Sequence, residues 1–360
     1  MGEWGERLAR LGGELAAHDV PALLVTAPTN VRYLTSYAGS NGAVEGRPDG
    51  ATFLTDFRYA PTARTYESFV EVAIIERDLL GSVARRMPEL ARSDRVGFET
   101  SLSFGEQRRL DEGTEGIELV PLEGVVERLR RSKSELELAA IRHAMDELER
   151  VYQRIAEDGL VGRTETEVAW AIERQIREAG FPGLSFPPIV ASGPHGGSPH
   201  STPRDEPIPA GTLVVVDIGA QGESGYCSDC TRTFAAGPGL PDAAREEYAI
   251  VQAAQLAGLA AVRAGVPGVD ADAASRAVIA ERLDPALFGH GLGHGIGLNV
   301  HEAPTLATTS TDTLQAGDVC SVEPGIYRPD AWGIRIDDAV VVAEDGCEIL
   351  TGFTKELLEV

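Results

Sequence analysis

The histidine-rich run at residues 289–301, GHGLGHGIGLNVH, holds three of the seven histidines of the chain and five glycines. His290 and His294 stand four residues apart, the spacing at which two metal-binding histidines share one helix face. Glycine at every second position opposes a helix, because each glycine destabilises a helix interior by about 1 kcal/mol relative to alanine. The run therefore predicts an extended or looping backbone that approaches a ligand closely, while His290, His294 and His301 supply imidazoles.

Carboxylates interrupt or end four runs of the sequence that otherwise resemble apolar strands. A carboxylate in such a place is unfavourable unless it is paired or bound to a cation. Taken singly, each has an ordinary explanation as a salt bridge or a strand-end cap. Together with the histidine-rich run they favour a metal site. The positions are Asp217 after LVVV, Asp229 between two cysteines, Glu323 after VCSV, and Asp337 or Asp338 within IRIDDAVVV.

The ligand types narrow the choice of metal. A site rich in carboxylate oxygens with a little imidazole suits Mn, Co, Fe or Zn, and two such ions a few ångströms apart activate a water between them. We expect His294 to be a metal ligand and His301 to contact substrate or transfer a proton, although a lone histidine is more commonly a plain hydrogen-bonding residue. His200, within GSPHSTP, is a further loop histidine whose role the spacing does not reveal.

Cys227 and Cys230 form a CSDC pattern similar to a redox or zinc-binding CxxC motif. Residues three apart in a strand point to opposite faces, so we do not expect the two thiols to meet. We interpret them as packing residues kept reduced, with Cys227 on the Asp229 side of the sheet. Four cysteines in 360 residues are also too few for a disulfide framework, which agrees with a reducing compartment.

Composition excludes several kinds of partner. The formal charge of −24, from 56 acidic against 32 basic residues, repels polyanions, so we expect no nucleic-acid partner. The first twenty residues contain no apolar signal-peptide core, and no stretch approaches 18 uninterrupted apolar residues. We therefore expect a cytoplasmic protein with no membrane span.

The pattern of apolar residues divides the chain in two. Residues 1 to about 125 alternate β-type runs with helix-like segments at 3–17, 79–91 and 105–112, which is typical of an α/β layer. A charged helical stretch follows, capped by Ser132 or Ser134, and a boundary is expected near Arg130. We predict an amino-terminal domain over residues 1–128 and a second domain over residues 129–360.

In the second part, the sequence predicts further helices and two pairs of strands that carry the carboxylates. The helices are expected at 164–180, where TETE forms a capping box, and at 242–264 and 271–283. A stretch rich in proline and glycine follows the first of them and is expected to form loops or short strands. One strand pair, a hairpin, carries Asp217 and Asp229, and the closing pair carries Glu323 and Asp337.

The ordered motifs resemble the metallopeptidases of the pita-bread fold, which include Xaa-Pro dipeptidase (prolidase), aminopeptidase P and methionine aminopeptidase. NVRYLTSYAGSNG and FLTDFRYA are similar to the amino-terminal domain of the prolidase and aminopeptidase P branch. VVVDIGA, GYCSDCTRTF, GHGLGHGIGLNVHEAP, VEPGIY and GIRIDD are similar to its catalytic domain. The resemblance implies an α/β (α+β) protein with a small creatinase-like amino-terminal domain and a pita-bread catalytic domain.

The resemblance also implies a metal-dependent exopeptidase that hydrolyses the Xaa-Pro bond at the amino terminus of dipeptides or short peptides, through a hydroxide bridging two divalent ions, with Mn first and Co, Zn or Fe as alternatives. His200, His290 and His301 would contact substrate or stabilise the tetrahedral intermediate, Glu323 would also handle the proton of the attacking water, and Arg335 would lie near the site. We expect a homodimer. The implied metal ligands are Asp217, Asp229, His294, Glu323 and Asp337.

Two departures from the family pattern bear on the site. The last ligand of the family is usually Glu within RIED, whereas this chain has RIDD, and the Asp337 side chain is shorter by one methylene, about 1.5 Å. The hairpin from Asp217 to Asp229 is also one residue longer than usual, and a one-residue slip would turn a side chain to the other face. We expect the turn at residues 221–225 to absorb the extra residue, and metal 2 to be displaced or weakly held.

Two other functions remain compatible with the same architecture. A creatinase-like amidinohydrolase shares the two domains without needing a metal, and it is expected to lack the carboxylate set that this chain has. A non-catalytic scaffold that binds partners is the second alternative, and the change from Glu to Asp at position 337 keeps it open.

Overall fold

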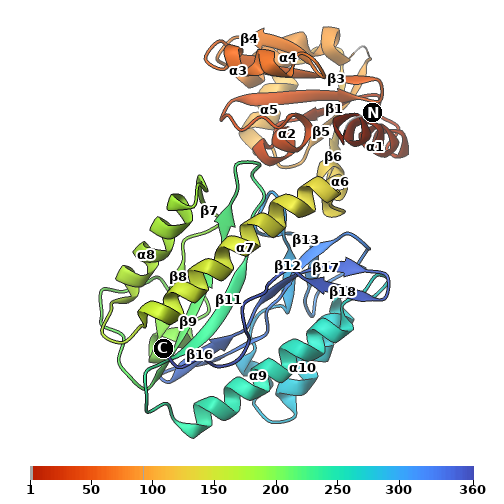
Figure 1. Cartoon of the computed structure of the whole chain (residues 1–360). Coiled ribbons are helices and arrows are strands. Elements are labelled where there is room, and N and C mark those ends of the chain that lie inside the picture. The colour runs from red at the N-terminus through yellow and green to blue at the C-terminus, as the bar shows by residue number, and fades with distance from the viewer. Residues whose placement is uncertain (1–2, 92) are drawn as a thin grey trace. The chain divides into compact units, whose positions relative to one another are not determined.

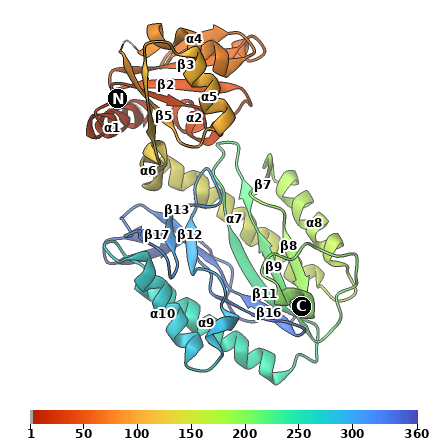
Figure 2. The same ribbon diagram turned by 180° about the vertical axis from the view of Figure 1, so that it is seen from behind.

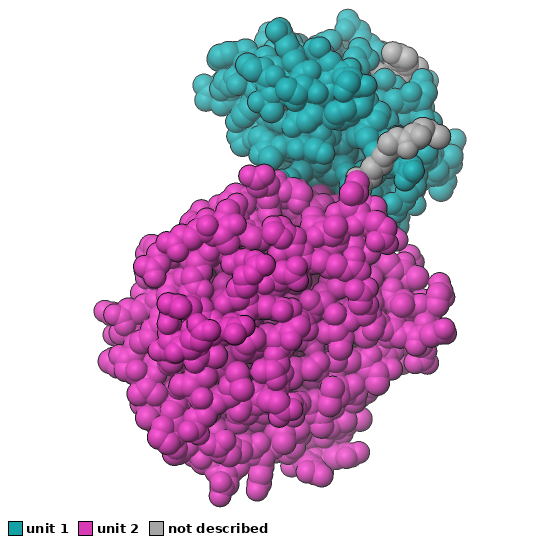
Figure 3. All heavy atoms as spheres, viewed as in Figure 1, with its two compact units in different colours: residues 1–130 teal, residues 131–360 magenta. Residues whose placement is uncertain are grey.

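The computed structural model describes residues 3–91 and 93–360, and the chain separates into two compact units, Met1–Arg130 and Arg131–Val360 (Figure 3). Unit 1 contains one six-stranded sheet, and unit 2 contains the remaining sheets together with the longest helices. Among the described residues, none of the helices is both long and apolar enough to cross a bilayer.

Unit 1 is an α/β layer whose sheet runs in the order β4-β3-β2-β1-β5-β6. Strands β1, β5 and β6 are mutually parallel, as are β3 and β4, whereas β2 is antiparallel to both of its neighbours. The strands are β1 (Leu23–Val25), β2 (Gly42–Arg47), β3 (Gly50–Asp56), β4 (Glu71–Ile75), β5 (Arg95–Glu99) and β6 (Glu118–Leu122). The helices are α1 (Glu3–Ala17), α2 (Pro28–Thr35), α3 (Ala60–Ala63), the 3-10 turn η1 (Arg64–Tyr66), α4 (Leu79–Ala91), α5 (Phe104–Gly113) and α6 (Val125–Arg131), which spans the division.

Alternation along β1 explains why helices cover both faces of this sheet. Leu24 packs into a cluster with Met87 of α4 and Leu110 of α5. Its neighbour Leu23 faces the other way and pairs with Gly46, where an added Cβ would lie 2.6 Å from Leu11 of α1. Successive residues of the strand thus pack into two separate apolar layers, one on each face of the sheet.

Unit 2 places four helices on the outside of a set of antiparallel strands, with α7 and α8 on one side and α9 and α10 on the other (Figures 1 and 2). The helices are α7 (Glu135–Asp158), α8 (Glu165–Glu178), α9 (Asp242–Ala261) and α10 (Gly268–Ala280), with 3-10 turns η2 (Gly193–Gly197) and η3 (Pro285–Leu287). The strands are β7 (Gly183–Leu184), β8 (Ile189–Ser192), β9 (Thr212–Ile218), β10 (Ala220–Gln221), β11 (Cys230–Ala236), β12 (Gly293–Gly295), β13 (Glu302–Leu306), β14 (Val319–Val322), β15 (Gly325–Arg328), β16 (Trp332–Arg335), β17 (Asp338–Ala343) and β18 (Gly346–Ile349).

The two halves of unit 2 repeat one arrangement, which the sequence did not reveal. In each half two helices precede three antiparallel strands, ordered β11-β9-β8 in the first half and β17-β14-β12 within the larger sheet of the second. Asp217 is the last residue but one of β9 and Asp229 precedes β11, while Glu323 follows β14 and Asp337 precedes β17. The four carboxylates therefore occupy matching places in the two halves.

Capping side chains fix where the first two helices of unit 2 begin. Ser134, rather than Ser132, caps α7 and forms a capping box with Glu137, and Thr164 does the same for α8 with Glu167. Helix α10 begins three residues earlier than the sequence indicated, at Gly268, directly after Pro267. A Cβ at Gly268 would lie 2.2 Å from the carbonyl oxygen of Thr305, so the helix starts where only glycine fits.

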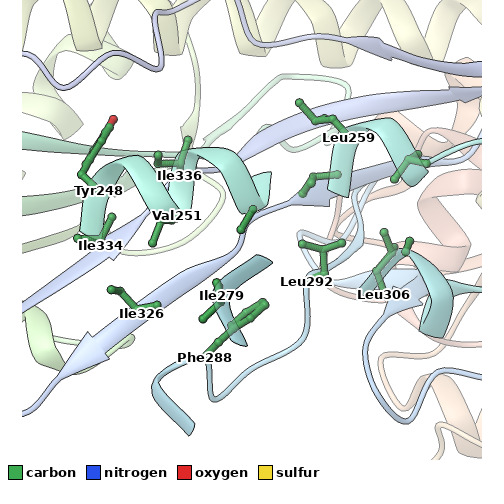
Figure 4. Packing of buried hydrophobic residues seen from close by; sticks show 14 of the residues in the cluster. Tyr248, Val251, Leu259, Ile279, Phe288, Leu292, Leu306, Ile326, Ile334 and Ile336 are labelled. Atoms are coloured by element: carbon green, nitrogen blue, oxygen red, sulfur yellow. The ribbon is translucent and has the colours of Figure 1, made fainter. Parts of the chain in front are cut away.

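The apolar face of α9 organises the core of the second half (Figure 4). Tyr248, Val251 and Leu259 of this helix belong to one buried cluster with residues from the strands and loops beneath it. The other labelled members are Ile279, Phe288, Leu292, Leu306, Ile326, Ile334 and Ile336. The last two belong to the segment that ends at Asp337, so core packing holds the backbone from which that carboxylate projects.

The closing segment forms five strands, β14 to β18, rather than the two expected. β14 and β17 pair with each other, whereas β15 and β16 form a separate hairpin between them in sequence. The prediction of a single strand pair was wrong because the strands are interrupted at Pro324 and at Asp337, and the alternation of apolar residues does not mark these interruptions. The inserted hairpin places Tyr327 and Arg335 beside the carboxylates.

Candidate active site

The β9–β11 hairpin keeps one register over its whole length. Thr212 pairs with Ala236, Asp217 with Thr231, and Gln221 still pairs with Cys227 at the far end. The connection between Gln221 and Cys227 is therefore the part of the hairpin outside this register, and it includes the turn that we expect to absorb an extra residue. With this register Asp217 and Asp229 lie on the same face, and no side chain is turned away by a slip.

The glycines of the histidine-rich run let β12 pass between its neighbours. A Cβ at Gly293 would lie 2.0 Å from the carbonyl oxygen of Ser321, and one at Gly295 would lie 2.1 Å from that of Ala303. Strand β12 pairs with both β13 and β14, with an irregularity after His294. The prediction of an extended, looping backbone is confirmed, and the absent side chains are what allow His294 to reach the carboxylates.

The structure brings most of the sequence-derived site residues to one cavity of about 420 Å³. Asp337 is the exception, since it is buried behind the cavity, beside the other carboxylates. The candidate residues that line the cavity are His200, Asp217, Asp229, His290, His294, His301, Glu323 and Arg335.

His294 lies against two of the carboxylates. Its Nε2 is 3.2 Å from Oε1 of Glu323 and 3.5 Å from Oδ2 of Asp229, while Nδ1 is 3.1 Å from the carbonyl oxygen of Gly295. This backbone contact favours the tautomer that leaves Nε2 toward the carboxylates, as in metal-ligating histidines. Against the effect of burial, the hydrogen bond and charge of Glu323 raise the pKa of His294 to about 9.

The remaining three carboxylates are buried close together, and one of them, Asp217, forms an ion pair with Arg335. Burial and the neighbouring carboxylates raise the pKa of Asp229 and of Asp337 well above the usual range, and burial raises that of Asp217 against the opposing effect of Arg335. Oδ1 of Asp217 and Oδ1 of Asp337 are both buried without a hydrogen-bond partner. Buried acceptors of this kind call for a compensating group, and a dication supplies one.

The carboxylates and His294 therefore fit divalent ions, because oxygen and imidazole ligands suit such ions and two of the buried oxygens have no hydrogen-bond partner. Within residues 3–91 and 93–360, however, no three or more His, Cys, Asp or Glu side chains are already arranged as a metal cage. When several carboxylates are buried together without a cation, burial and their mutual repulsion favour the protonated form of each carboxyl group. Cation binding to this cluster would thus be coupled to the loss of protons from its members.

Arg335 links Asp217 to Tyr327, a residue that sequence reasoning missed. Nη2 of Arg335 donates to Oδ2 of Asp217 (2.7 Å), Nη1 donates to the Tyr327 hydroxyl (2.7 Å), and Nε donates to Oγ1 of Thr231 (3.0 Å). Tyr327 and Arg335 share a face of the β15–β16 hairpin, because Tyr327 pairs with Gly333, two residues before Arg335. Tyr327 follows Glu323 by four positions in the motif VEPGIY, and this closeness in sequence was the signal that could have placed it near the site.

His290 is engaged through both of its ring nitrogens. Nε2 is 2.9 Å from the Tyr327 hydroxyl, and Nδ1 is 2.7 Å from the carbonyl oxygen of Gly291. Because that hydroxyl accepts a hydrogen bond from Arg335, its own hydrogen is available to His290 Nε2. Burial lowers the pKa of His290, which agrees with a neutral ring. Both ring nitrogens of His290 therefore have partners within the chain, while the ring also lines the cavity.

His200 and His301 are the exposed histidines of the cavity. His301 lies against His294, with 4.3 Å between the ring centroids, and both burial and the charge of His294 lower its pKa. His200 lies in the segment between β8 and β9, far from the histidine-rich run in sequence, but it lines the same cavity. Two imidazoles thus face the space above the carboxylates from different segments.

An apolar wall completes the cavity, and no residue pattern predicted it. It comes from the turn before β8 and from the segment after η2. Such a wall suits a compact apolar group, since cavities that bind small ligands combine apolar surface with few polar groups. Its members are Phe186, Pro187, Pro188, Ile189, Pro199 and Pro203.

Asp338 and the cysteines lie apart from the cavity. Asp338 accepts hydrogen bonds from Arg232 (2.8 Å), Gln255 (2.8 Å) and Lys355 (2.6 Å) on the opposite face of β17. It is therefore Asp337, not Asp338, that belongs to the carboxylate cluster. Cys227 and Cys230 are buried free thiols, which confirms their interpretation as packing residues.

Two family models match the chain: the creatinase/prolidase N-terminal domain over residues 7–132 and metallopeptidase family M24 over residues 139–344. The chain belongs to metallopeptidase family M24, whose members are peptidases that use divalent metals. This confirms the family resemblance and the expected fold, a creatinase-type amino-terminal domain followed by an M24 catalytic domain.

Relatives match the chain from end to end. An uncharacterised peptidase of Bacillus subtilis (strain 168) is 38% identical over 357 residues, covering 98% of this chain and 99% of that one. A solved structure of an Xaa-Pro dipeptidase from Bacillus anthracis superposes with a TM-score of 0.95 at 34% identity, covering 99% and 100% of the two chains. An X-Pro aminopeptidase from Thermotoga maritima superposes with a TM-score of 0.88 at 31% identity, covering 97% and 100%. This chain is thus similar to peptidases of both the dipeptidase and the aminopeptidase kind.

Proposed function

We propose that this protein is a metal-dependent exopeptidase that hydrolyses the Xaa-Pro bond at the amino terminus of dipeptides or short peptides. The observation that carries the proposal is the buried carboxylate cluster, in which Oδ1 of Asp217 and Oδ1 of Asp337 have no hydrogen-bond partner. The similarity to an Xaa-Pro dipeptidase and an X-Pro aminopeptidase supports it. The residues that would hold two divalent ions are Asp217, Asp229, His294, Glu323 and Asp337.

Manganese is the ion that we propose first, with cobalt, zinc and iron as alternatives that the same oxygen-rich ligands accept. When bound, the ions polarise the scissile carbonyl and lower the pKa of water. Against burial, the hydrogen bond and charge of His294 lower the pKa of Glu323 to about 2, so this carboxylate is ionised in the metal-free chain. As the family resemblance implies, we assign to Glu323 the removal of the proton of the attacking water and its return to the leaving nitrogen.

The exposed histidines act on the substrate oxygen. His200 and His301 line the cavity from two segments, and we assign to their N–H groups the stabilisation of the negative charge that develops on the scissile carbonyl oxygen. Arg335 and Tyr327 hold Asp217 and His290 in place by the contacts described above. These roles divide the site into groups that bind the ions, a group that moves the proton and groups that meet the substrate.

The apolar wall supports the preference for proline. The pyrrolidine ring is compact and apolar, and its imide nitrogen carries no N–H that would need an acceptor. The wall at residues 186–189 offers aromatic and aliphatic surface and two further proline rings. An ordinary peptide would bury an N–H against this surface without a partner, which is unfavourable.

Hydrolysis assays with and without metal test the proposal. The purified chain, treated with chelator and reloaded with Mn²⁺, is expected to cleave Ala-Pro or Ala-Pro-Ala and to leave Ala-Ala and Ala-Ala-Ala largely intact. Chelator is expected to abolish cleavage. Full peptidase activity in metal-free protein, or hydrolysis of creatine instead of Xaa-Pro substrates, would contradict the proposal.

A further inference from the structure

The segment between β8 and β9 forms one side of the cavity but has little regular structure of its own. After the short turn η2, residues Pro199, His200, Ser201, Thr202 and Pro203 all line the cavity. An irregular segment keeps a defined position only if its polar groups have partners elsewhere. The position of His200 therefore depends on whatever holds this segment.

A single buried carboxylate, that of Glu165, binds both ends of the segment. Oε1 accepts hydrogen bonds from the backbone N–H and the hydroxyl of Ser192, each at 2.8 Å. Oε2 accepts from the backbone N–H of Arg204 at 2.9 Å and lies 2.8 Å from Nδ1 of His195. Glu165 thus closes residues 192–204 into a loop with His200 inside it.

The environment of Glu165 suits an ionised, fixed carboxylate. Its side chain is 0% exposed and begins α8, where the helix dipole favours negative charge. Although burial opposes it, the backbone hydrogen bonds from Ser192 and Arg204 lower the pKa of Glu165. Arg204 adds longer contacts from Nε (3.4 Å) and Nη2 (3.5 Å). The carboxylate therefore receives charge-assisted hydrogen bonds from three residues of one loop.

The middle of the loop is joined to the site itself. Nη1 of Arg335 donates to the carbonyl oxygen of Pro199 (3.2 Å), and the same guanidinium binds Asp217. Inside the loop, the Ser201 hydroxyl donates to the carbonyl oxygen of His195 (2.7 Å). A Cβ at Gly197 would lie 2.5 Å from the carbonyl oxygen of Arg328, so the loop fits closely over the β15–β16 hairpin. A shift at the ends of the loop would therefore move His200 relative to Asp217.

We propose that Glu165 is a positioning residue for the peptidase reaction: it sets the place of His200 over the carboxylate cluster without itself binding metal or substrate. This inference rests on the proposed function, because it assigns to His200 the contact with the substrate oxygen. None of the partners of Glu165 belongs to the carboxylate cluster. Loss of its charge is therefore expected to affect turnover and leave metal binding unchanged.

The first test is the substitution E165Q with E167Q as the matched control. A glutamine has one oxygen, so it retains the contacts at Ser192 or at Arg204 but not both. Glu167 lies two residues further along in the same first turn, is exposed, and contacts Thr164 rather than the loop. E165Q is expected to lower kcat/KM by roughly 10- to 100-fold, mainly through kcat, because small misplacements of a catalytic group have effects of this size. E167Q is expected to stay near the unaltered chain.

A double-mutant cycle with H200A separates positioning from general stability. If Glu165 acts through His200, E165Q is expected to have little further effect on kcat in the H200A background. E165D, which keeps the charge on a shorter side chain, is expected to fall between E165Q and the unaltered chain. Fully additive losses from E165Q and H200A, or a loss of Mn²⁺ binding in E165Q measured by calorimetry, would overturn the inference.

Hydrogen exchange makes the inference testable even if the chain does not cleave Xaa-Pro bonds. In E165Q, amides of residues 193–204 are expected to exchange faster, while those of β9 and β11 keep their protection. Unchanged exchange in this segment would show that Glu165 does not hold the loop. Faster exchange without any Xaa-Pro hydrolysis in the unaltered chain would instead leave the hold on the loop intact and refute the proposed function.

Discussion

Nη2 of Arg335 donates a 2.7 Å hydrogen bond to Oδ2 of Asp217, while Oδ1 of the same carboxylate is buried with no partner. One oxygen is thus neutralised by a fixed guanidinium, and the other is left for a cation. The same guanidinium binds the Tyr327 hydroxyl, which reaches His290. A planar group with several N–H donors is needed to bind Asp217 and Tyr327 at once, and the ammonium group of lysine does not have this geometry.

The substitution R335K is therefore expected to lower kcat/KM by roughly 10- to 100-fold, although it keeps the charge. R328K is the matched control, because Arg328 lies on the same hairpin and pairs with Glu247. Steady-state kinetics on an Xaa-Pro substrate compares the two variants. Equal activity of R335K and the unaltered chain would show that a simple positive charge is sufficient beside Asp217.

His294 and His301 are adjacent but are expected to differ in metal binding. H294A removes the imidazole that lies against Glu323 and Asp229 and that we propose as a metal ligand. Loss of a hydrogen bond that supports a metal ligand lowers metal affinity by roughly 10- to 100-fold, and the loss of the ligand itself is expected to lower the affinity for Mn²⁺ by more. H301A is expected to keep its metal and to lose turnover. Elemental analysis after dialysis distinguishes the two variants, and equal metal loss in both would refute the assignment.

The loop held by Glu165 predicts a pH dependence of stability. The pKa of Glu165 is lowered in the folded chain, so its contribution is present above the unfolded pKa of about 4.5 and is lost as the pH falls through the lower folded pKa. Near pH 7 we expect chelator-treated E165Q to be less stable than the unaltered protein by about 1.5 to 3 kcal/mol, the usual worth of hydrogen bonds to a charged group. Thermal unfolding between pH 3 and 7 is expected to show this difference shrinking below about pH 4.5, and a constant difference would contradict the linkage.

The sequence predicted local structure where short-range chemistry decides it. The capping box at Thr164 predicts the start of α8, whereas the pattern before α7 leaves Ser132 and Ser134 as alternatives. The alternating glycines predict the extended backbone around His294. Tyr327 could not be placed, because its contact with Arg335 depends on the register of a hairpin that the apolar pattern did not separate from its neighbours.

Glu165 and the apolar wall were missed for a related reason. Glu165 reads in sequence as an ordinary acidic residue in the first turn of a helix, and its contact with Ser192 spans 27 positions. Long-range contacts of this kind arise from packing, which a residue pattern does not encode. The homodimer and the cytoplasmic location stay predictions from the sequence and the family resemblance.

The backbone at Asp337 is fixed from three sides. Its N–H donates to the carbonyl oxygen of Thr231 (3.1 Å), and its carbonyl oxygen accepts from Nη1 of Arg232 (2.5 Å) and from the thiol of Cys230 (3.4 Å). Asp338 is held on the opposite face by Arg232 and its other partners, with 0% exposure. These contacts oppose an inward shift of the backbone at Asp337 and a turn of Asp338 toward the cluster.

Asp337 is consequently expected to hold the second ion weakly. Its side chain is about 1.5 Å shorter than the Glu that the family pattern has at this place, and its Oδ1 remains buried without a partner. D337E is expected to raise the affinity for a second Mn²⁺ and the activity at limiting metal. D338E, which adds the same methylene on the opposite face, is the control and is expected to disturb the Arg232 contact without strengthening the second site. Titration calorimetry with Mn²⁺ measures both; two equally tight sites in the unaltered chain would show that the shorter carboxylate is accommodated.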